Sequence, residues 1–247
     1  MNSSEFRICG KQMIDIAADY LDNIELRKVL PDIKPGYIKA LIPDAAPQEP
    51  EKWDDLVKDI ERVIMPGVTH WHSPNFHAYF PTGNSYPAIC ADILSDAIGC
   101  IGFTWIASPA CTELEVVMLD WLAKMLNLPE FYIASSDGLG GGVLQGTASE
   151  ATYVALLAAK NKKIIEIQKS NPELEKHYIH SRLVAYCSEQ AHSCCERACL
   201  LASIICRKLP VDEKFSLRGK TLLEAIEKDK NDGYFPFYVR LVDTDRK

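Results

Sequence analysis

The sequence has no long apolar run, no excess of positive charge and no secretion signal. Its apolar runs fall short of the roughly 18–20 residues that span a bilayer. The first residues, Met-Asn-Ser-Ser-Glu-Phe-Arg, lack the basic-then-apolar pattern of a signal peptide. A formal net charge of −7 offers no basic surface to nucleic acid or to an anionic membrane. These absences predict a cytoplasmic protein that binds neither nucleic acid nor membrane.

The cysteines form neither a disulfide framework nor a zinc-binding pattern. There are nine of them, an odd number, and no C-x-x-C pair occurs. Cys90, Cys100 and Cys111 stand among apolar residues, so we expect buried, reduced thiols of the kind found in the cytosol. No metal site is expected.

The composition is that of a globular protein, with 47% hydrophobic and 25% charged residues among 247. Apolar residues recur at helical spacing in several segments, at about 4–27, 50–63, 87–101, 112–126 and 217–230. A further helix follows Gly146 and ends near Lys169. Short apolar runs at 183–187 and 235–239 are typical of buried strands. Buried strands that alternate with helices predict an α/β fold with a parallel sheet.

Some details of these helices can also be predicted. Thr112 and Glu115 match a capping box, and one helix face then carries an apolar stripe of Leu114, Val117, Met118, Trp121, Leu122 and Met125. The helix that ends near Lys169 is expected to turn four small residues inward, namely Ala151, Val154, Ala155 and Ala158. Gly233 occupies a helix C-cap position. Five prolines within 29–50 exclude a long helix there.

A run of three glycines at 140–142, followed by Gly146, precedes the helix that ends near Lys169. The first turn of a helix presents unpaired backbone N–H groups and partial positive charge, which suit a phosphate. The hydroxyls of Thr147 and Ser149 could add donors. The stretch matches neither G-x-x-x-x-G-K-[ST] nor G-x-G-x-x-G. By itself it favours the alternative, an ordinary glycine-rich turn with a helix cap.

Residues 66–84 are rich in Gly, Pro, His and aromatic residues and follow neither a helical nor a strand period. No acidic residue or cysteine lies close enough to His70, His72 and His77 to complete a zinc signature. The aromatic side chains could line a pocket for a flat ligand. A packed aromatic loop without a ligand explains the segment equally well.

His192 follows the strand expected at 183–187 and precedes another helix. Ligands of α/β proteins bind beyond the carboxyl ends of the strands. An imidazole at this place can stack on a ring or move protons. A lone histidine is more often structural, so its position alone is a weak signal.

Taken together and in this order, these segments resemble the group II pyridoxal-phosphate-dependent decarboxylases, and within them the aromatic L-amino-acid decarboxylase group. The resemblance covers essentially residues 1–239. It is carried by 43–50 (PDAAPQEP), 65–71 (MPGVTHW), 107–115 (ASPACTELE) and 140–145 (GGGVLQ).

The resemblance implies a fold, a cofactor and an assembly. The fold is an α/β one, with an amino-terminal helical arm and the first part of an aspartate-aminotransferase-like (fold type I) large domain. The helical dimerisation segment would span 1–85 and the partial cofactor-binding domain 86–239, while 240–247 is a tail outside the family pattern. The cofactor is pyridoxal 5′-phosphate. The protein would be a homodimer whose amino-terminal helices wrap around the partner subunit.

The resemblance also implies roles for single residues. Ala148 and Ser149 hold the phosphate of the cofactor, and Thr82 lies near the phosphate. His192 stacks on the pyridine ring and transfers a proton at the α-carbon of the substrate, which makes it the catalytic residue. Together with Thr82 and His192, the pocket for an aromatic side chain is lined by Trp71, Tyr79, Phe80, Pro81, Ile101 and Phe103.

The implied reaction is that of a carboxy-lyase, which converts dopa, 5-hydroxytryptophan or tyrosine to the biogenic amine and carbon dioxide. Segments 103–105 and 215–219 are also similar to histidine decarboxylase, which is one alternative. The family's Schiff-base lysine follows the strand expected at 235–239, and no matching lysine occurs here. We therefore expect a truncated chain, and the second alternative is an inactive isoform that acts as a dimerisation partner. Related aldehyde synthases carry Asn at the position of His192, so this histidine favours decarboxylation.

Overall fold

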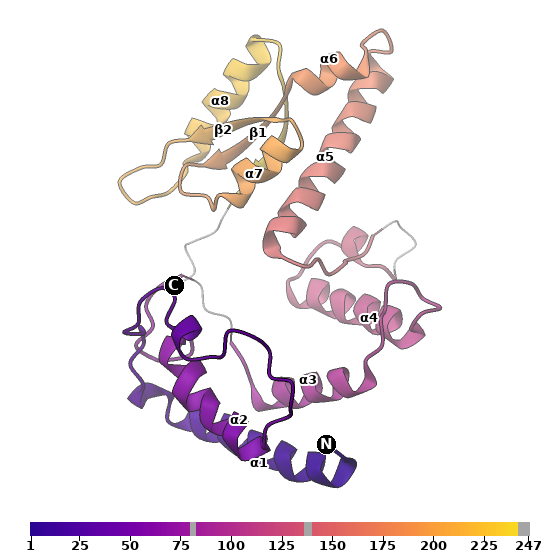
Figure 1. Cartoon of the computed structure of the whole chain (residues 1–247). Coiled ribbons are helices and arrows are strands. Elements are labelled where there is room, and N and C mark those ends of the chain that lie inside the picture. Colours follow the sequence, from indigo (N-terminus) through magenta and orange to yellow (C-terminus); the bar gives the residue numbers. More distant parts are fainter. Residues whose placement is uncertain (80–82, 136–139, 242–247) are drawn as a thin grey trace. The chain divides into compact units, whose positions relative to one another are not determined.

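The computed structural model describes residues 1–79, 83–135 and 140–241. The chain forms two compact units, Met1–Cys100 and Ile101–Lys247 (Figure 1). The functional division expected at residues 85 and 239 stays a prediction.

The described residues of the first unit form helices and turns. Its α-helices are α1 (Ser3–Asp22), α2 (Trp53–Asp59), which continues into a π-helical turn (Ile60–Ile64), and α3 (Tyr86–Ile98). Short 3-10 turns lie at Ile24–Leu26, Ile38–Ala40 and Met65–Gly67. The proline-rich segment 29–50 contains no α-helix, as predicted.

The predicted apolar face of α1 packs mainly within its own unit. Ile24 is buried, and Met13 and Tyr20 are half-buried. The Tyr20 hydroxyl and Nδ1 of His70 are 2.9 Å apart and share a hydrogen bond. Phe6, by contrast, is exposed at the amino-terminal end of the helix. The carboxy-terminal half of this face is therefore covered within the first unit, and the expected packing of the amino-terminal helices on a partner subunit stays a prediction.

The second unit is an α/β structure with a three-stranded parallel sheet. Its helices are α4 (Pro109–Met125), α5 (Ala148–Ser170), α6 (Lys176–Ser181), α7 (Cys194–Leu201) and α8 (Gly219–Asn231), with a 3-10 turn at Glu130–Tyr132. The strands β1 (Leu183–Ser188), β2 (Ile205–Leu209) and β3 (Phe235–Arg240) lie in the order β2-β1-β3. Both strand pairs are parallel, which confirms the predicted α/β fold.

The central strand β1 carries the core on both faces of the sheet because alternate side chains point to opposite sides. Leu183 and Ala185 pack with Leu156 of α5 and with Ala198 and Cys199 of α7. The other face carries a second cluster, in which Val184, Tyr186 and Leu209 pack with Leu222 and Ile226 of α8. Helices thus cover both faces of the sheet (Figure 1).

A buried ionic network joins this sheet to α8. Asp229 accepts a hydrogen bond from the Tyr186 hydroxyl at 2.7 Å and one from Nη2 of Arg207 at 2.9 Å. Burial opposes ionisation of Asp229, but the hydrogen bonds from Arg207 and Tyr186 outweigh it and lower the pKa of the carboxyl. The network compensates the charge that β2 brings into the sheet.

Three local predictions are corrected by the structure. Strand β2 was not predicted, because Arg207 and Lys208 interrupt its apolar pattern. Helix α4 begins at Pro109, which favours the first helical position, so Thr112 lies inside the helix and does not cap it. Helix α5 buries Thr152, Leu156 and Ile167. The four small residues expected to face inward are all exposed, namely Ala151, Val154, Ala155 and Ala158.

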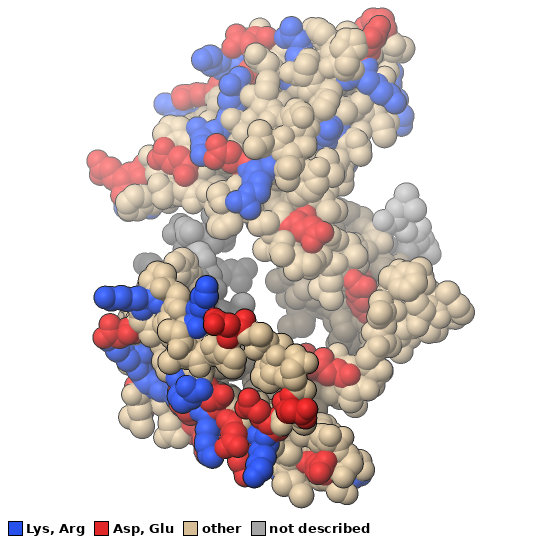
Figure 2. Space-filling model, in the orientation of Figure 1, with Lys and Arg blue, Asp and Glu red and all other residues tan. Residues whose placement is uncertain are grey.

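The apolar stripe predicted on α4 exists but is exposed in all six members. In Figure 2, α4 lies at the right in a largely uncharged area of the face drawn. None of the nine cysteines, all of which lie among the described residues, forms a disulfide, but Cys90 and Cys100 are exposed, contrary to expectation. Among the residues described, no helix is both long and apolar enough to cross a membrane.

Candidate functional site

The first turn of α5 presents backbone donors for an anion. Thr147 caps the helix, because its Oγ1 accepts the N–H of Glu150 at 3.0 Å. Ala148 and Ser149 are the first two residues of the helix, so the helix has no carbonyl oxygen four residues earlier to accept their N–H groups, which are left unsatisfied. Ser149 is half-buried and adds a hydroxyl. This end of α5 also carries the partial positive charge of the helix dipole.

The glycine run before α5 serves close packing. A Cβ atom on Gly140 would overlap the carbonyl oxygen of Phe131, and one on Gly142 would come within 3.0 Å of the Leu119 side chain. Glycine is therefore required at position 140, where the segment crosses the backbone of the turn at Glu130–Tyr132, and is favoured at position 142, beside helix α4. The backbone donors that could bind an anion thus lie at the start of α5, and the run itself fits the alternative of a packing turn.

His192 lies in the loop between β1 and α7, beyond the carboxyl end of the central strand. Its Nδ1 accepts the backbone N–H of Cys194 at 3.1 Å. Because Nδ1 is an acceptor, the neutral imidazole carries its proton on Nε2. The side chain is exposed, so Nε2–H is available to a ligand.

The loop of His192 and the start of α5 are linked within the second unit. The thiol of Cys194 lies 3.9 Å from Oγ1 of Thr152, and Thr152 donates to the carbonyl oxygen of Ala148 at 2.9 Å. Beside this link is a cavity of about 210 Å³, whose lining includes Ser149, Tyr153, Cys194 and Arg197. The structure thus places Ala148, Ser149 and His192 in one part of the second unit.

The predicted aromatic segment forms a stacked cluster in the first unit. The ring of Trp71 stacks on Phe76 and on Tyr79, with centroids 4.8 and 5.3 Å apart. Sequence reasoning gave Phe76 no role, although its place between the two predicted residues was a signal. Phe80, Pro81 and Thr82, which are predicted site residues, lie outside the described residues.

His70 has a structural role in the packing of the first unit. It is buried and hydrogen-bonded to Tyr20, and burial together with the nearby Arg27 guanidinium lowers the pKa of its imidazole. Among the described residues, no three His, Cys, Asp or Glu side chains are arranged to hold a metal ion.

The remaining predicted residues, Ile101 and Phe103, belong to the second unit and are both exposed. Trp71 and Tyr79 belong to the first unit. The structure therefore describes Trp71 and Tyr79 within the first unit, and Ile101 and Phe103 within the second.

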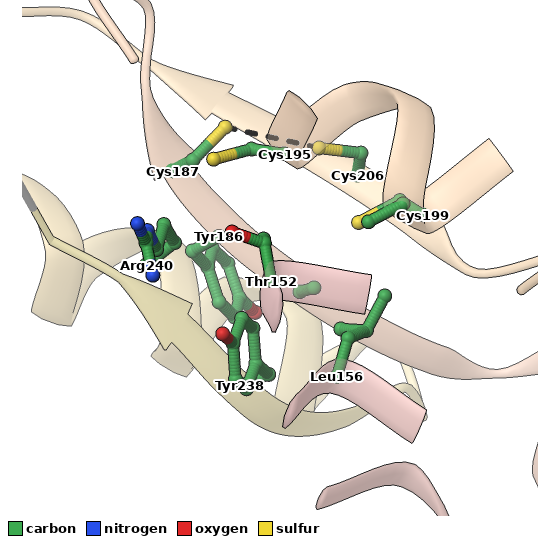
Figure 3. A pocket seen from close by; sticks show the side chains of 11 residues that line it. Thr152, Leu156, Tyr186, Cys187, Cys195, Cys199, Cys206, Tyr238 and Arg240 are labelled. Carbon is green, nitrogen blue, oxygen red and sulfur yellow. Dashed lines mark hydrogen bonds between the residues drawn. The ribbon is translucent and has the colours of Figure 1, made fainter. Parts of the chain in front are cut away.

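A second, much smaller cavity lies between α5, α7 and the sheet (Figure 3). It measures about 10 Å³, roughly the space of one water, and Cys187, Cys195 and Cys206 contribute to its wall. Burial and the neighbouring Cys206 raise the pKa of the Cys187 thiol to about 12, and burial and Cys194 raise that of Cys195 to about 11. Protonated, enclosed thiols of this kind are inert, and the space cannot hold a cofactor.

A parallel α/β unit with a free helix start and an imidazole beyond its central strand is the arrangement of a protein that binds a phosphorylated ligand. The family model described as the pyridoxal-dependent decarboxylase conserved domain matches residues 35–242. The chain belongs to this family.

The chain is similar to aromatic-L-amino-acid decarboxylases from animals. It is 62% identical to that of Drosophila melanogaster over 96% of this chain and 46% of the relative, and 59% identical to that of Rattus norvegicus over 97% and 50%. The structure of Oryza sativa TDC with PLP superposes with a TM-score of 0.85 at 37% identity, over 97% of this chain and 51% of that one. The chain thus spans about half the length of the relatives that it matches.

The cofactor of the family is pyridoxal 5′-phosphate, and the described residues fit it. Two free N–H groups and a hydroxyl at the start of α5 suit its phosphate, and the exposed imidazole of His192 suits its flat ring.

Proposed function

We propose that the whole protein, of which this chain spans about half, is a cytoplasmic carboxy-lyase that converts an aromatic L-amino acid to its amine. The substrates proposed are dopa, 5-hydroxytryptophan and tyrosine. The observation that carries the proposal is the 62% identity to a decarboxylase named for this reaction, over nearly the full chain. The free N–H groups at the start of α5 and the exposed His192 support it.

In this proposal each part of the site has one task. The N–H groups of Ala148 and Ser149, with the Ser149 hydroxyl, bind the cofactor phosphate, and Thr82 lies near it. His192 stacks on the ring and moves a proton at the α-carbon through Nε2. Bound pyridoxal phosphate supplies a ring that accepts the electrons released as carbon dioxide leaves.

The aromatic residues of the proposal bind the side chain of the substrate and exclude water from it. Trp71 and Tyr79 already stack in parallel, with ring planes 11° apart, and offer flat apolar surfaces. The exposed side chains of Ile101 and Phe103 supply further apolar surface. Phe80 and Pro81 are proposed to complete the pocket.

The test uses a chimera of residues 1–239 joined to the matching carboxy-terminal half of the Drosophila melanogaster relative. Release of carbon dioxide is measured with dopa, 5-hydroxytryptophan, tyrosine and histidine. We expect release from at least one aromatic substrate and little from histidine. Release from histidine alone would favour the histidine decarboxylase alternative. An inactive chimera that still lowers the activity of an added full-length relative would favour a dimerisation partner.

We also propose that the protein assembles as a homodimer through apolar surface that the described residues leave open. On α1, Phe6, Ile8 and Ile14 are exposed, and on α4 the entire apolar stripe is exposed. Apolar side chains gathered in this way mark surfaces that another chain covers. A second copy is the proposed partner because most soluble oligomers are symmetric homo-oligomers.

Replacing both Phe6 and Ile8 by Ser in the chimera is expected to weaken the dimer by at least about a hundredfold. Each side chain loses roughly 1.5–3 kcal/mol of burial across the interface, and 1.4 kcal/mol corresponds to a tenfold change in affinity. Sedimentation over a range of concentrations measures the change. Lys11→Ser, at an exposed position of the same helix, is the matched control and should leave the dimer intact. Equal dimer affinity in both variants would show that α1 lies outside the interface.

A further inference from the structure

Cys194 contacts both His192 and helix α5. Its backbone N–H donates to Nδ1 of His192 at 3.1 Å, and its thiol donates to Oγ1 of Thr152 at 3.9 Å. Thr152 donates in turn to the carbonyl oxygen of Ala148 at 2.9 Å. Thr152 and Cys194 are both buried. Their contacts form a continuous path from the imidazole to the first residue of α5.

We propose that Thr152 and Cys194 are positioning residues that hold the imidazole of His192 at a fixed distance from the first turn of α5. This rests on the proposed function, in which that turn binds the cofactor phosphate and His192 lies on its ring. Phosphate and ring belong to one small molecule with a short linker. The protein groups that bind them must therefore keep their separation to within about 0.5 Å.

The hydroxyl of Thr152 does more than satisfy its own helix. A threonine that donates to the carbonyl four residues earlier is common in helices and indicates no function by itself. Here the same hydroxyl also accepts from a thiol on α7. Packing of the two helices rests on other side chains, Leu156 on α5 and Ala198 and Cys199 on α7. Loss of the hydroxyl should therefore release His192 while the two helices stay packed.

The experiment compares Thr152→Val, which keeps the shape and removes the hydroxyl, with Thr152→Ser, which keeps the hydroxyl. Dissociation constants of pyridoxal phosphate and of inorganic phosphate are measured for the 247-residue chain by calorimetry. Thr152→Val is expected to raise the dissociation constant of pyridoxal phosphate about tenfold. The dissociation constant of inorganic phosphate should rise less than about twofold, because the N–H groups at the start of α5 are unchanged. Thr152→Ser should restore the preference.

A second measurement needs no ligand. In the wild-type chain, side-chain ¹⁵N signals of His192 should show a proton on Nε2 and an accepting Nδ1. In Thr152→Val and in Cys194→Ala, these signals should shift towards a mixture of tautomers. Cys194→Ala keeps the backbone N–H and removes only the thiol contact, so it isolates the link to Thr152.

The outcomes separate this inference from the proposed function. If Thr152→Val lowered the affinities for pyridoxal phosphate and inorganic phosphate equally, or left both unchanged, the positioning role would be overturned. Unchanged His192 signals in both variants would overturn it as well, whatever the ligand data. A wild-type chain that binds pyridoxal phosphate no better than inorganic phosphate, with variant signals shifted as expected, would support the link and contradict the cofactor site.

Discussion

Asn in place of His192 is expected to lower amine formation by the chimera by about 10²–10⁴-fold, the usual contribution of a positioned proton donor. An amide side chain cannot move a proton at the α-carbon, and it lacks the ring that stacks on the cofactor. With proton delivery slowed, a larger share of turnover should end in the aldehyde, in keeping with the Asn that related aldehyde synthases carry at this position. Amine and aldehyde are quantified by chromatography of reactions run under air.

The matched control is His177→Asn, at an exposed position of α6. Among the described residues, the only ion-pair partner of the His177 imidazole is Glu175. Its amine rate and product ratio should equal those of the wild type. If His192→Asn also left both unchanged, His192 would have no part in the chemistry. A fall in cofactor affinity with an unchanged rate at saturation would restrict its role to binding the ring.

Asp229→Asn is expected to lower the free energy of unfolding by about 3 kcal/mol, the largest stability effect that we expect from one side chain of this network. Asp229 is 4% exposed and is the common acceptor for Tyr186 and Arg207. The amide of Asn offers one acceptor oxygen in place of two and leaves the Arg207 charge without its partner. Urea unfolding at neutral pH measures the change, and Glu227→Gln, at an exposed position of α8, is the control.

The same network predicts how stability depends on pH. Hydrogen bonds hold the pKa of Asp229 below its unfolded value of about 3.9, although burial acts against them. Its contribution is therefore complete above about pH 5 and is lost as the pH falls through the folded pKa. The wild type should lose stability more steeply than Asp229→Asn below about pH 5. Parallel pH curves for the two proteins would show that folding does not change the pKa of Asp229, and would contradict the prediction.

The positions of most helices and of two strands could be predicted from local sequence. Apolar residues at a period of 3.6 defined α1 and α8, and short apolar runs defined β1 and β3. The helix start at Ala148 and the loop position of His192 followed from the same local signals. These predictions succeeded because each depends on residues that are near neighbours in the chain.

Strand β2 and the buried face of α5 depended on distant residues. A strand that contains Arg207 is tolerated because Asp229, which lies 22 residues later on helix α8, compensates the charge of the guanidinium. The inward face of α5 is the one that meets β1 and α7, so Thr152 and Leu156 are buried, and the four residues predicted to face inward are not. Local periodicity counts apolar residues, but it cannot say which neighbour they will meet.

The sequence by itself determined the type of fold, the helix start at Ala148 and the loop position of His192, because periodicity, helix-start chemistry and family motifs are local. Only the tertiary structure decided the protonated nitrogen of His192, which depends on the N–H of Cys194, and the link from that residue through Thr152 to Ala148. It also decided that the α4 stripe stays open. The contact between Cys194 and Thr152 depends on two helices that come together only when the chain folds, and such pairings between distant side chains leave no periodic signal in a single sequence. The hydrogen bond between Cys194 and His192 is local, but it depends on the conformation of the loop, which periodicity does not give.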